Sequence, residues 1–223
     1  MRDIKQHEST IKTFLDLIFS QYGNHFILKG GTALRYCYGL NRFSEDIDLD
    51  SIDTEIAIEK TLQDYCAENK YSFRFRKNSN TVKRCIIHYN NLDSGDDLLK
   101  IEISFRRGFI TKEAYTYING VYVYTLDELC ALKLAAYSDR AKIRDLYDLC
   151  FLGNCCFDSL SNATKRNMQN VMAERGLDFA DSLLVQSEDN LIDKDALAVS
   201  VLDLYGKLNL IDDVPSPVDD WIP

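Results

Sequence analysis

The sequence has little proline and no apolar stretch long enough to cross a membrane. All three prolines lie in the last nine of its 223 residues, and we expect residues 214–223 to form a loosely held tail. No apolar run approaches the roughly 18 residues that a membrane-spanning helix requires. The first six residues are too polar for a signal peptide. We therefore expect a cytoplasmic protein with no membrane partner.

Cysteine pairs of the C-x-x-C type are also absent. The chain has seven cysteines, an odd number, which argues against both a disulfide framework and a zinc site. We expect reduced cysteines that act mainly as small apolar core residues. Hydrophobic residues make up 46% of the chain and charged residues 27%, a composition typical of a globular protein.

The negative charge is concentrated at one end. Residues 172–223 contain 12 acidic and 3 basic residues, a net charge of −9 that equals the net charge of the whole chain. The first 171 residues are therefore neutral overall. Within them, every charged residue between Glu68 and Asp93 is basic, which indicates either a polyanion-binding stripe or the solvated face of a hairpin. The stripe consists of Lys70, Arg74, Arg76, Lys77, Lys83 and Arg84.

A pair of glycines follows the short apolar run 26–28. Thr32 then begins a predicted helix, and adjacent glycines allow backbone N–H groups to approach a phosphate with no Cβ in the way. Gly30 and Gly31 therefore predict a phosphate cradle, although an ordinary strand-to-helix turn has the same pattern.

Aspartates alternate with apolar residues over positions 46–50. This period of two predicts a strand with Asp46, Asp48 and Asp50 on one face. Neighbouring carboxylates repel one another unless the face is solvated or a hard cation such as Mg²⁺ lies between them. Asp46 and Asp48 are thus candidate metal ligands, with a solvated acidic face as the alternative.

Together, the two motifs resemble the nucleotidyltransferase superfamily to which DNA polymerase beta belongs. More closely, residues 29–34 with Arg42, Ser44 and the run 46–49 resemble the AbiEii-type nucleotidyltransferases, toxins of type IV toxin–antitoxin and abortive-infection systems. The resemblance extends over about residues 25–152. The nucleotide-binding residues that it implies are Lys29, Gly30, Gly31, Thr32, Arg42 and Ser44.

A third carboxylate stands on a later predicted strand, residues 98–105. Glu102 lies alone between Ile101 and Ile103, and it would join the same metal site if its strand lies beside the aspartate strand. The resemblance places a catalytic carboxylate on a comparable strand. An outward-facing glutamate on an edge strand is the alternative.

The predicted helices after residue 125 contain further candidate residues. Lys133 would bind triphosphate charge, as the resemblance implies, unless its ammonium group simply extends to solvent. The resemblance also assigns catalytic roles to Asp145 and Asp148. An internal ion-pair network of these aspartates with Arg140 and Arg144 is equally compatible with the sequence.

The order of the predicted elements favours an α+β fold. We expect a nucleotidyltransferase-type mixed sheet flanked by helices at residues 1–120, followed by a helical domain at residues 121–223. Residues 8–22 predict a helix with Ser9 or Thr10 as its cap, and residues 115–124 predict an extended segment. A capping box at residues 125–128 begins the first helix of that second domain.

The leading hypothesis for function is a Mg²⁺-dependent nucleotidyltransferase, with one metal ion or two, that moves a nucleoside monophosphate from an NTP to an acceptor hydroxyl. Asp46 and Asp48 would hold the metal, and Glu102 would contribute to the metal site and activate the hydroxyl. The resemblance to toxins favours the 3′ end of a transfer RNA as the acceptor, with a protein side chain as the alternative, and adds an antitoxin as an expected partner. Acceptor binding is assigned to Arg74, Arg76, Lys77, Lys83 and Arg84.

Two other functions are considered. A phosphatase of the haloacid-dehalogenase type would use Asp46 and Asp48 as nucleophile and acid, but it needs an apolar strand directly before the first aspartate, which residues 42–45 do not supply. A partner-binding protein on a degenerate transferase fold would leave the unpaired carboxylates at an electrostatic cost without benefit.

Overall fold

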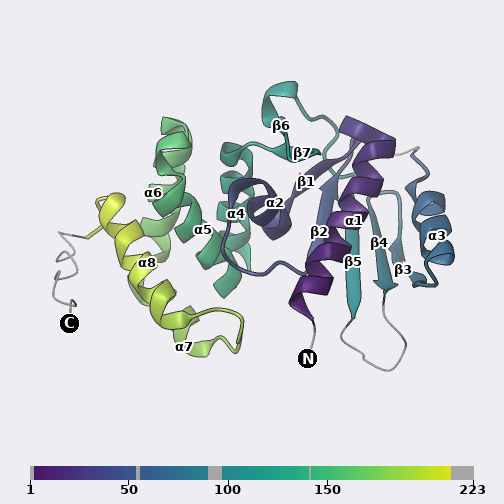
Figure 1. Ribbon diagram of the computed structural model, residues 1–223. Helices are drawn as coiled ribbons and strands as arrows, with labels where there is room; N and C mark the ends of the chain where they lie inside the picture. The colour runs from purple at the N-terminus through teal and green to yellow at the C-terminus, as the bar shows by residue number, and fades with distance from the viewer. Residues whose placement is uncertain (1–2, 54–55, 90–96, 141, 212–223) are drawn as a thin grey trace. The chain divides into compact units, whose positions relative to one another are not determined.

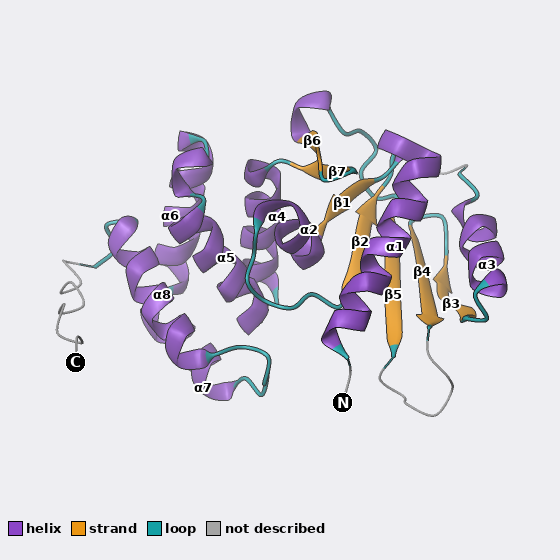
Figure 2. Ribbon diagram, in the orientation of Figure 1, coloured by secondary structure: helices purple, strands orange, loops and turns teal. Residues whose placement is uncertain are grey.

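The computed structural model describes residues 3–53, 56–89, 97–140 and 142–211 (Figure 1). The chain divides into two compact units, Met1–Thr125 and Leu126–Pro223. The first unit combines a sheet with helices and the second is helical, so the predicted α+β class is confirmed (Figure 2). The division falls after the strand Val121–Tyr124 rather than before it, because that strand pairs within the sheet. The predicted tail, residues 214–223, lies outside the described residues.

The N-terminal unit is built on a seven-stranded mixed sheet with the strand order β3-β4-β5-β2-β1-β7-β6. The strands are β1 (Ile27–Lys29), β2 (Asp46–Asp50), β3 (Ser72–Asn78), β4 (Val82–His88), β5 (Leu98–Ser104), β6 (Tyr115–Ile118) and β7 (Val121–Tyr124). Strand β2 lies at the centre, antiparallel to β1 and parallel to β5. The aspartate strand is therefore held between two neighbours that are distant in sequence.

One face of this sheet is apolar and covered by helices. Helix α1 (Ile4–Tyr22) crosses β2 and β5 in Figure 1, and α3 (Ile58–Glu68) packs beside β3. The side chains of Ile47, Leu49 and Ile101 on this face are completely buried. Because side chains alternate along a strand, the aspartates and Glu102 point to the opposite face.

Helix α2 (Gly30–Tyr38) follows β1 directly and ends at Gly39, which adopts a left-handed conformation with φ of 83°. Among the described residues of this unit, two connections contain short 3-10 helices, η1 (Gly23–His25) and η2 (Lys112–Ala114). The segment predicted only as extended, residues 115–124, is the β6–β7 hairpin. Its turn residues Asn119 and Gly120 both have positive φ, as a tight two-residue hairpin turn requires.

The C-terminal unit consists of packed helices. They are α4 (Leu126–Asp139), α5 (Ile143–Cys155), α6 (Asn162–Arg175), α7 (Leu177–Gln186) and α8 (Lys194–Lys207), with a short 3-10 helix η3 (Phe157–Ser159). Helices α5 and α8 approach closely at Gly153, where an added Cβ would lie 2.2 Å from Leu204 Cδ1. Among the described residues, no helix of either unit is both long and apolar enough to span a membrane.

All seven cysteines are free thiols, as the sequence predicted. Four of them are buried in apolar surroundings, and burial raises their thiol pKa. These four are therefore packing residues rather than nucleophiles.

Candidate active site

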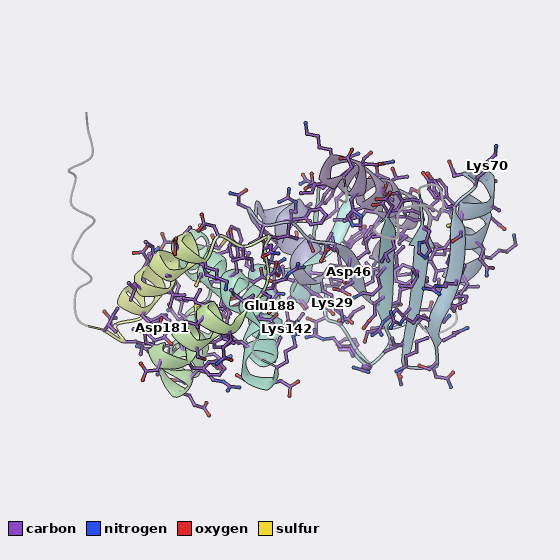
Figure 3. The ribbon with its side chains drawn as sticks, turned by 90° about the horizontal axis from the view of Figure 1, so that it is seen from below. Lys29, Asp46, Lys70, Lys142, Asp181 and Glu188 are labelled. Carbon is purple, nitrogen blue, oxygen red and sulfur yellow. The ribbon has the colours of Figure 1, made fainter. Side chains whose placement is uncertain are left out.

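The pairing of β2 with β1 and β5 brings three candidate residues into one row. Asp48 lies opposite Glu102 of β5 in the parallel register, and opposite Lys29 of β1 in the antiparallel register. Residues in directly opposed positions share a face of the sheet. The condition set for Glu102 by the sequence, that its strand lies beside the aspartate strand, is thus met. Lys29 and Asp46 lie near one another on this unit (Figure 3).

The three candidate carboxylates are Asp46, Asp48 and Glu102. Two of them form ion pairs with a basic residue on a neighbouring strand. Lys100 Nζ lies 2.5 Å from Asp46 Oδ2, and Arg84 Nη2 lies 2.5 Å from Glu102 Oε2. These carboxylates were expected to be unpaired, and that expectation was wrong. Lys100 and Arg84 occupy the strand positions opposite Asp46 and Glu102, so the register itself creates both pairs.

Asp48, between these pairs, has no hydrogen bond or ion pair with any residue in the described part of the chain. Burial raises its pKa above the ordinary value; the charges of Asp46 and Glu102 raise it further, while those of Lys100 and Lys29 oppose the rise. Because the ionised form of Asp48 is disfavoured, a cation bound beside it would stabilise that form.

The glycine turn fits closely around the carboxylate row. Gly30 has a φ of 77°, and a Cβ there would lie 2.9 Å from Asp48 Oδ2. A Cβ on Gly31 would lie 2.7 Å from Arg42 Nη2 and 3.0 Å from Ser44 Oγ. Gly30 is therefore favoured by both its φ and its contact with Asp48, whereas a side chain at Gly31 would require Arg42 and Ser44 to shift.

Hydroxyl groups link α2 to the start of β2. The Thr32 hydroxyl is hydrogen-bonded to Ser44 Oγ, 2.9 Å away, and to the backbone carbonyl of Asp46. Arg42 is buried and donates to the carbonyl of Phe43 at 3.1 Å. Thr32 and Ser44 also border an open pocket of about 660 Å³ between α1 and α2, which none of the three carboxylates lines.

The third aspartate of the strand has a structural environment. Asp50 is 2% exposed; its carboxylate contacts Lys29 Nζ at 2.5 Å and accepts a hydrogen bond of 2.9 Å from the Tyr124 hydroxyl. Arg107 Nε lies 3.8 Å from the same carboxylate. Burial and the Asp50 charge raise the pKa of Tyr124. The ammonium group of Lys29 thus supports Asp50, an arrangement the sequence did not reveal.

The candidates of the C-terminal unit form a buried ionic cluster. Lys133 Nζ lies 2.5 Å from Asp148 Oδ2 and 3.6 Å from Asp145 Oδ1, and Arg140 donates two hydrogen bonds of 2.9 and 3.0 Å to Asp145. Lys133 is 8% exposed, so its ammonium group does not extend to solvent. Arg144 pairs instead with Asp189, at 2.5 Å.

Asp145 titrates below its ordinary range. Burial alone would raise its pKa, but the hydrogen bonds from Arg140 and the charge of Lys133 outweigh burial and lower it. The carboxylate is therefore ionised at neutral pH and holds both cations in place.

The basic stripe divides between the two faces of the sheet. Arg74, Arg76 and Lys77 of β3 are exposed, whereas Lys83 points to the helix-covered side, where it lies 2.5 Å from Glu59 of α3. Adjacent strand residues face opposite ways, so Lys83 cannot act together with Arg84 on one surface. Lys70 lies at the far end of this unit from Asp46 (Figure 3).

Sequence reasoning missed three further residues at the site. Lys100 could have been found from its spacing of two before Glu102, which places both side chains on one face. Tyr124 gave no local signal. His7, completely buried in α1, lies 2.6 Å from the Tyr89 hydroxyl, and its Nε2 donates to the carbonyl of Glu45 at 2.9 Å. This bridge ties α1 to the residue directly before Asp46.

Three carboxylates on one face are the donor type that Mg²⁺ prefers. As they stand, no three His, Cys, Asp or Glu side chains within the described ranges are arranged to hold a metal ion. The residues fit a divalent cation in kind, but Lys100 and Arg84 already occupy positions beside Asp46 and Glu102.

A mixed sheet whose carboxylates lie on adjacent parallel strands, beside a glycine turn that opens a helix, defines a nucleotidyltransferase fold. Residues 13–204 match the family described as "Nucleotidyl transferase AbiEii toxin, Type IV TA system". The match spans most of the chain, so this protein belongs to that family and is a nucleotidyltransferase, as its motifs predicted.

Solved structures support the fold. JHP933 from Helicobacter pylori is 25% identical, with a TM-score of 0.75 over 94% of this chain and 95% of that protein. MenT4, a nucleotidyltransferase toxin from Mycobacterium tuberculosis, is 22% identical, with a TM-score of 0.54 over 95% of this chain and 87% of that one. No curated protein matches the sequence significantly.

Proposed function

We propose that this protein transfers a nucleoside monophosphate from an NTP to a hydroxyl group of an RNA, in a reaction that requires Mg²⁺. The observation that carries the proposal is the single row of Asp48 and Glu102 beside the Gly30 turn, with Asp46 at the next position of the same face. Positioning and neutralisation of charge are the main requirements of phosphoryl transfer, and this row supplies sites for both.

Asp46, Asp48 and Glu102 are the residues that would hold the divalent cation. When bound, the cation supplies neutralisation of the charge on the transferring phosphoryl group. The glycine turn directs the first backbone N–H groups of α2 at the nucleotide phosphates, with the hydroxyls of Thr32 and Ser44 beside them. Glu102 accepts the proton of the acceptor hydroxyl.

For the buried cluster we propose two roles. Asp145 and Asp148 of α5 hold Lys133 of α4 in a fixed position, and Lys133 binds triphosphate charge, as the family motif implies. A lysine that two aspartates orient is more rigid than a surface lysine, because its side-chain entropy has already been lost on folding.

The acceptor surface is proposed to be the exposed part of β3. In the sheet register, Lys77 lies opposite Arg84, Arg84 opposite Glu102, and Glu102 opposite Asp48. This row leads from the edge strand directly to the carboxylates. A polyanion bound along Arg74 and Lys77 would present its terminal hydroxyl to Glu102, which favours an RNA over a small sugar.

The test is transfer of labelled NTP to total transfer RNA in the presence of Mg²⁺. Charge reversal of Arg74, Arg76 and Lys77 to Glu should abolish RNA labelling and growth inhibition while NTP binding persists, and wild-type labelling should fall steeply with salt. The matched control reverses three exposed lysines elsewhere, Lys5, Lys12 and Lys60, with the same change in net charge. Equal RNA labelling by both triple variants would refute the RNA surface, as would labelled nucleotide found only on a protein.

A degenerate, partner-binding protein is the second candidate. The pairs Lys100–Asp46 and Arg84–Glu102 favour it, because they remove much of the electrostatic cost that the sequence held against it. Absence of NTP binding and of any transfer would select this alternative. The family also supports a cognate antitoxin as a partner.

A further inference from the structure

Two ion pairs at the row of Asp46, Asp48 and Glu102 are more exposed to solvent than the ion pairs of Asp50 and Asp148. The Lys100 and Arg84 side chains are 29% and 35% exposed, and each contacts a single carboxylate oxygen of its partner. The pairs of Asp50 and Asp148 are, by contrast, built on carboxylates that are 3% and 0% exposed. The first two pairs are open to solvent and can exchange partners, whereas the buried pairs cannot do so without a large desolvation cost.

The register explains why these two cations lie where they do. Lys100 and Asp46 are directly opposite, as are Arg84 and Glu102, and both pairs flank Asp48 on the same face. Lys29 also lies opposite Asp48, but its ammonium group contacts Asp50 instead. The row therefore has two neutralised carboxylates and, between them, an aspartate with no ion pair to the described residues.

We propose that Lys100 and Arg84 are exchangeable counter-ions: they hold Asp46 and Glu102 when no divalent cation is bound, compete with that cation, and transfer to substrate phosphates once it displaces them. Arg84 would then contact the acceptor, because it lies between Lys77 and Glu102 in the row. Lys100 would contact the NTP beside Asp46. Only the second part of this inference, the transfer of Lys100 and Arg84 to substrate phosphates, rests on the proposed transferase function.

Two physical arguments support the exchange. A divalent cation beside three carboxylates raises the local positive charge, so an ammonium or guanidinium group within the same site becomes repelled. Both displaced side chains are long and attached to rigid central strands, so they can reach a phosphate near the row without movement of the backbone. Arginine is suited to a planar, two-point contact with phosphate, and lysine to a point contact.

The test measures metal binding without NTP or RNA, by titrating Mn²⁺ and following loss of the electron paramagnetic resonance signal of the free ion. Lys100→Met and Arg84→Met should each bind Mn²⁺ at least about threefold more tightly than the wild type, since each removes a competing cation from a half-exposed pair. Lys100→Arg and Arg84→Lys keep the charge and should bind as the wild type does. Lys60→Met, which removes an exposed cation paired with Asp64 on α3, controls for the change in net charge.

Unchanged or weaker Mn²⁺ binding by both Met variants would overturn the competition, and so would equal tightening by Lys60→Met. In the transfer assay, Arg84→Met should raise the KM for RNA and Lys100→Met the KM for NTP, despite tighter metal binding. Loss of folding is monitored by circular dichroism. If no variant and no wild-type protein transfers nucleotide while the Mn²⁺ result holds, the proposed function and the transfer of the two cations to substrate phosphates fail, and only their competition with the metal ion stands.

Discussion

Lys133 provides a direct test of the buried cluster in the C-terminal unit. Lys133→Met removes the ammonium group but keeps an unbranched side chain of similar length. Asp148 is 0% exposed and would then lose the cation at 2.5 Å, while Asp145 would keep Arg140. Removing one partner of a buried ion pair costs about 3–5 kcal/mol, because the remaining buried charge loses the cation that offset its desolvation.

This cost is large enough to measure by thermal unfolding. For a chain of this size it corresponds to a fall in Tm of about 6–20 °C. The sequence left open that the Lys133 ammonium group extends to solvent, in which case its replacement would cost little stability; its burial beside Asp148 excludes that alternative. Lys60→Met is the matched control: its pair with Asp64 is 79% and 58% exposed, so the change should leave the stability nearly unchanged.

A double variant separates the pair from its surroundings. Lys133→Met combined with Asp148→Asn removes both charges and should recover more than half of the lost stability, because the buried carboxylate charge is removed together with its cation. Urea unfolding with unchanged m values would confirm that stability, and not compactness, has changed. A Tm of Lys133→Met within about 2 °C of the Tm of Lys60→Met would show that the cluster does not stabilise the fold as argued. Such a difference corresponds to about 1 kcal/mol or less.

Further predictions concern the site and its pH dependence. Gly30→Ala should lower the free energy of unfolding by about 1–2 kcal/mol through backbone strain, and it should abolish transfer because the new Cβ displaces Asp48. Gly39 has a similar φ and open space around it, so Gly39→Ala should show the loss of stability alone. Asp46→Asn should abolish transfer yet change stability by no more than about 1 kcal/mol, as its pair is exposed; a global loss of structure by circular dichroism would contradict this. Because the folded-state pKa of Asp145 is lowered, its stabilising contribution is complete above about pH 4 and is lost as the pH falls through that lower value. Asp145→Asn should therefore flatten the acid limb of a stability–pH profile, and an unaltered limb would refute the cause assigned.

The sequence by itself determined the elements whose pattern is local. The aspartate strand begins and ends at the predicted residues 46 and 50, because alternation with a period of two over five residues suits only an extended chain with one apolar face. The glycine turn was equally readable, since positive φ at Gly30 and close approach at Gly31 depend on the missing Cβ. Both features, with the family motifs around them, were sufficient for the α+β class and the transferase assignment.

Other local signals were present and misread. The Asn119-Gly120 pair is a hairpin signature, yet the segment was predicted only as extended. Helix α1 begins after Asp3, whose side chain accepts from the Lys5 and Gln6 backbone N–H groups, and not near Ser9. Alternation also implies that Lys83 and Arg84 face opposite ways, which counting charges along the chain conceals.

Only the tertiary structure decided which charges meet. Asp48 and Glu102 are 54 positions apart in sequence, and their opposition depends on β5 inserting beside β2 in one parallel register. A shift of that register by one residue would move Glu102 and Lys100 to the helix-covered face together. The neutralisation of Asp46, the engagement of Lys29 by Asp50 and the burial of Lys133 between two aspartates follow from such pairings. They are set by packing of segments distant in sequence, and no period within a single segment encodes them.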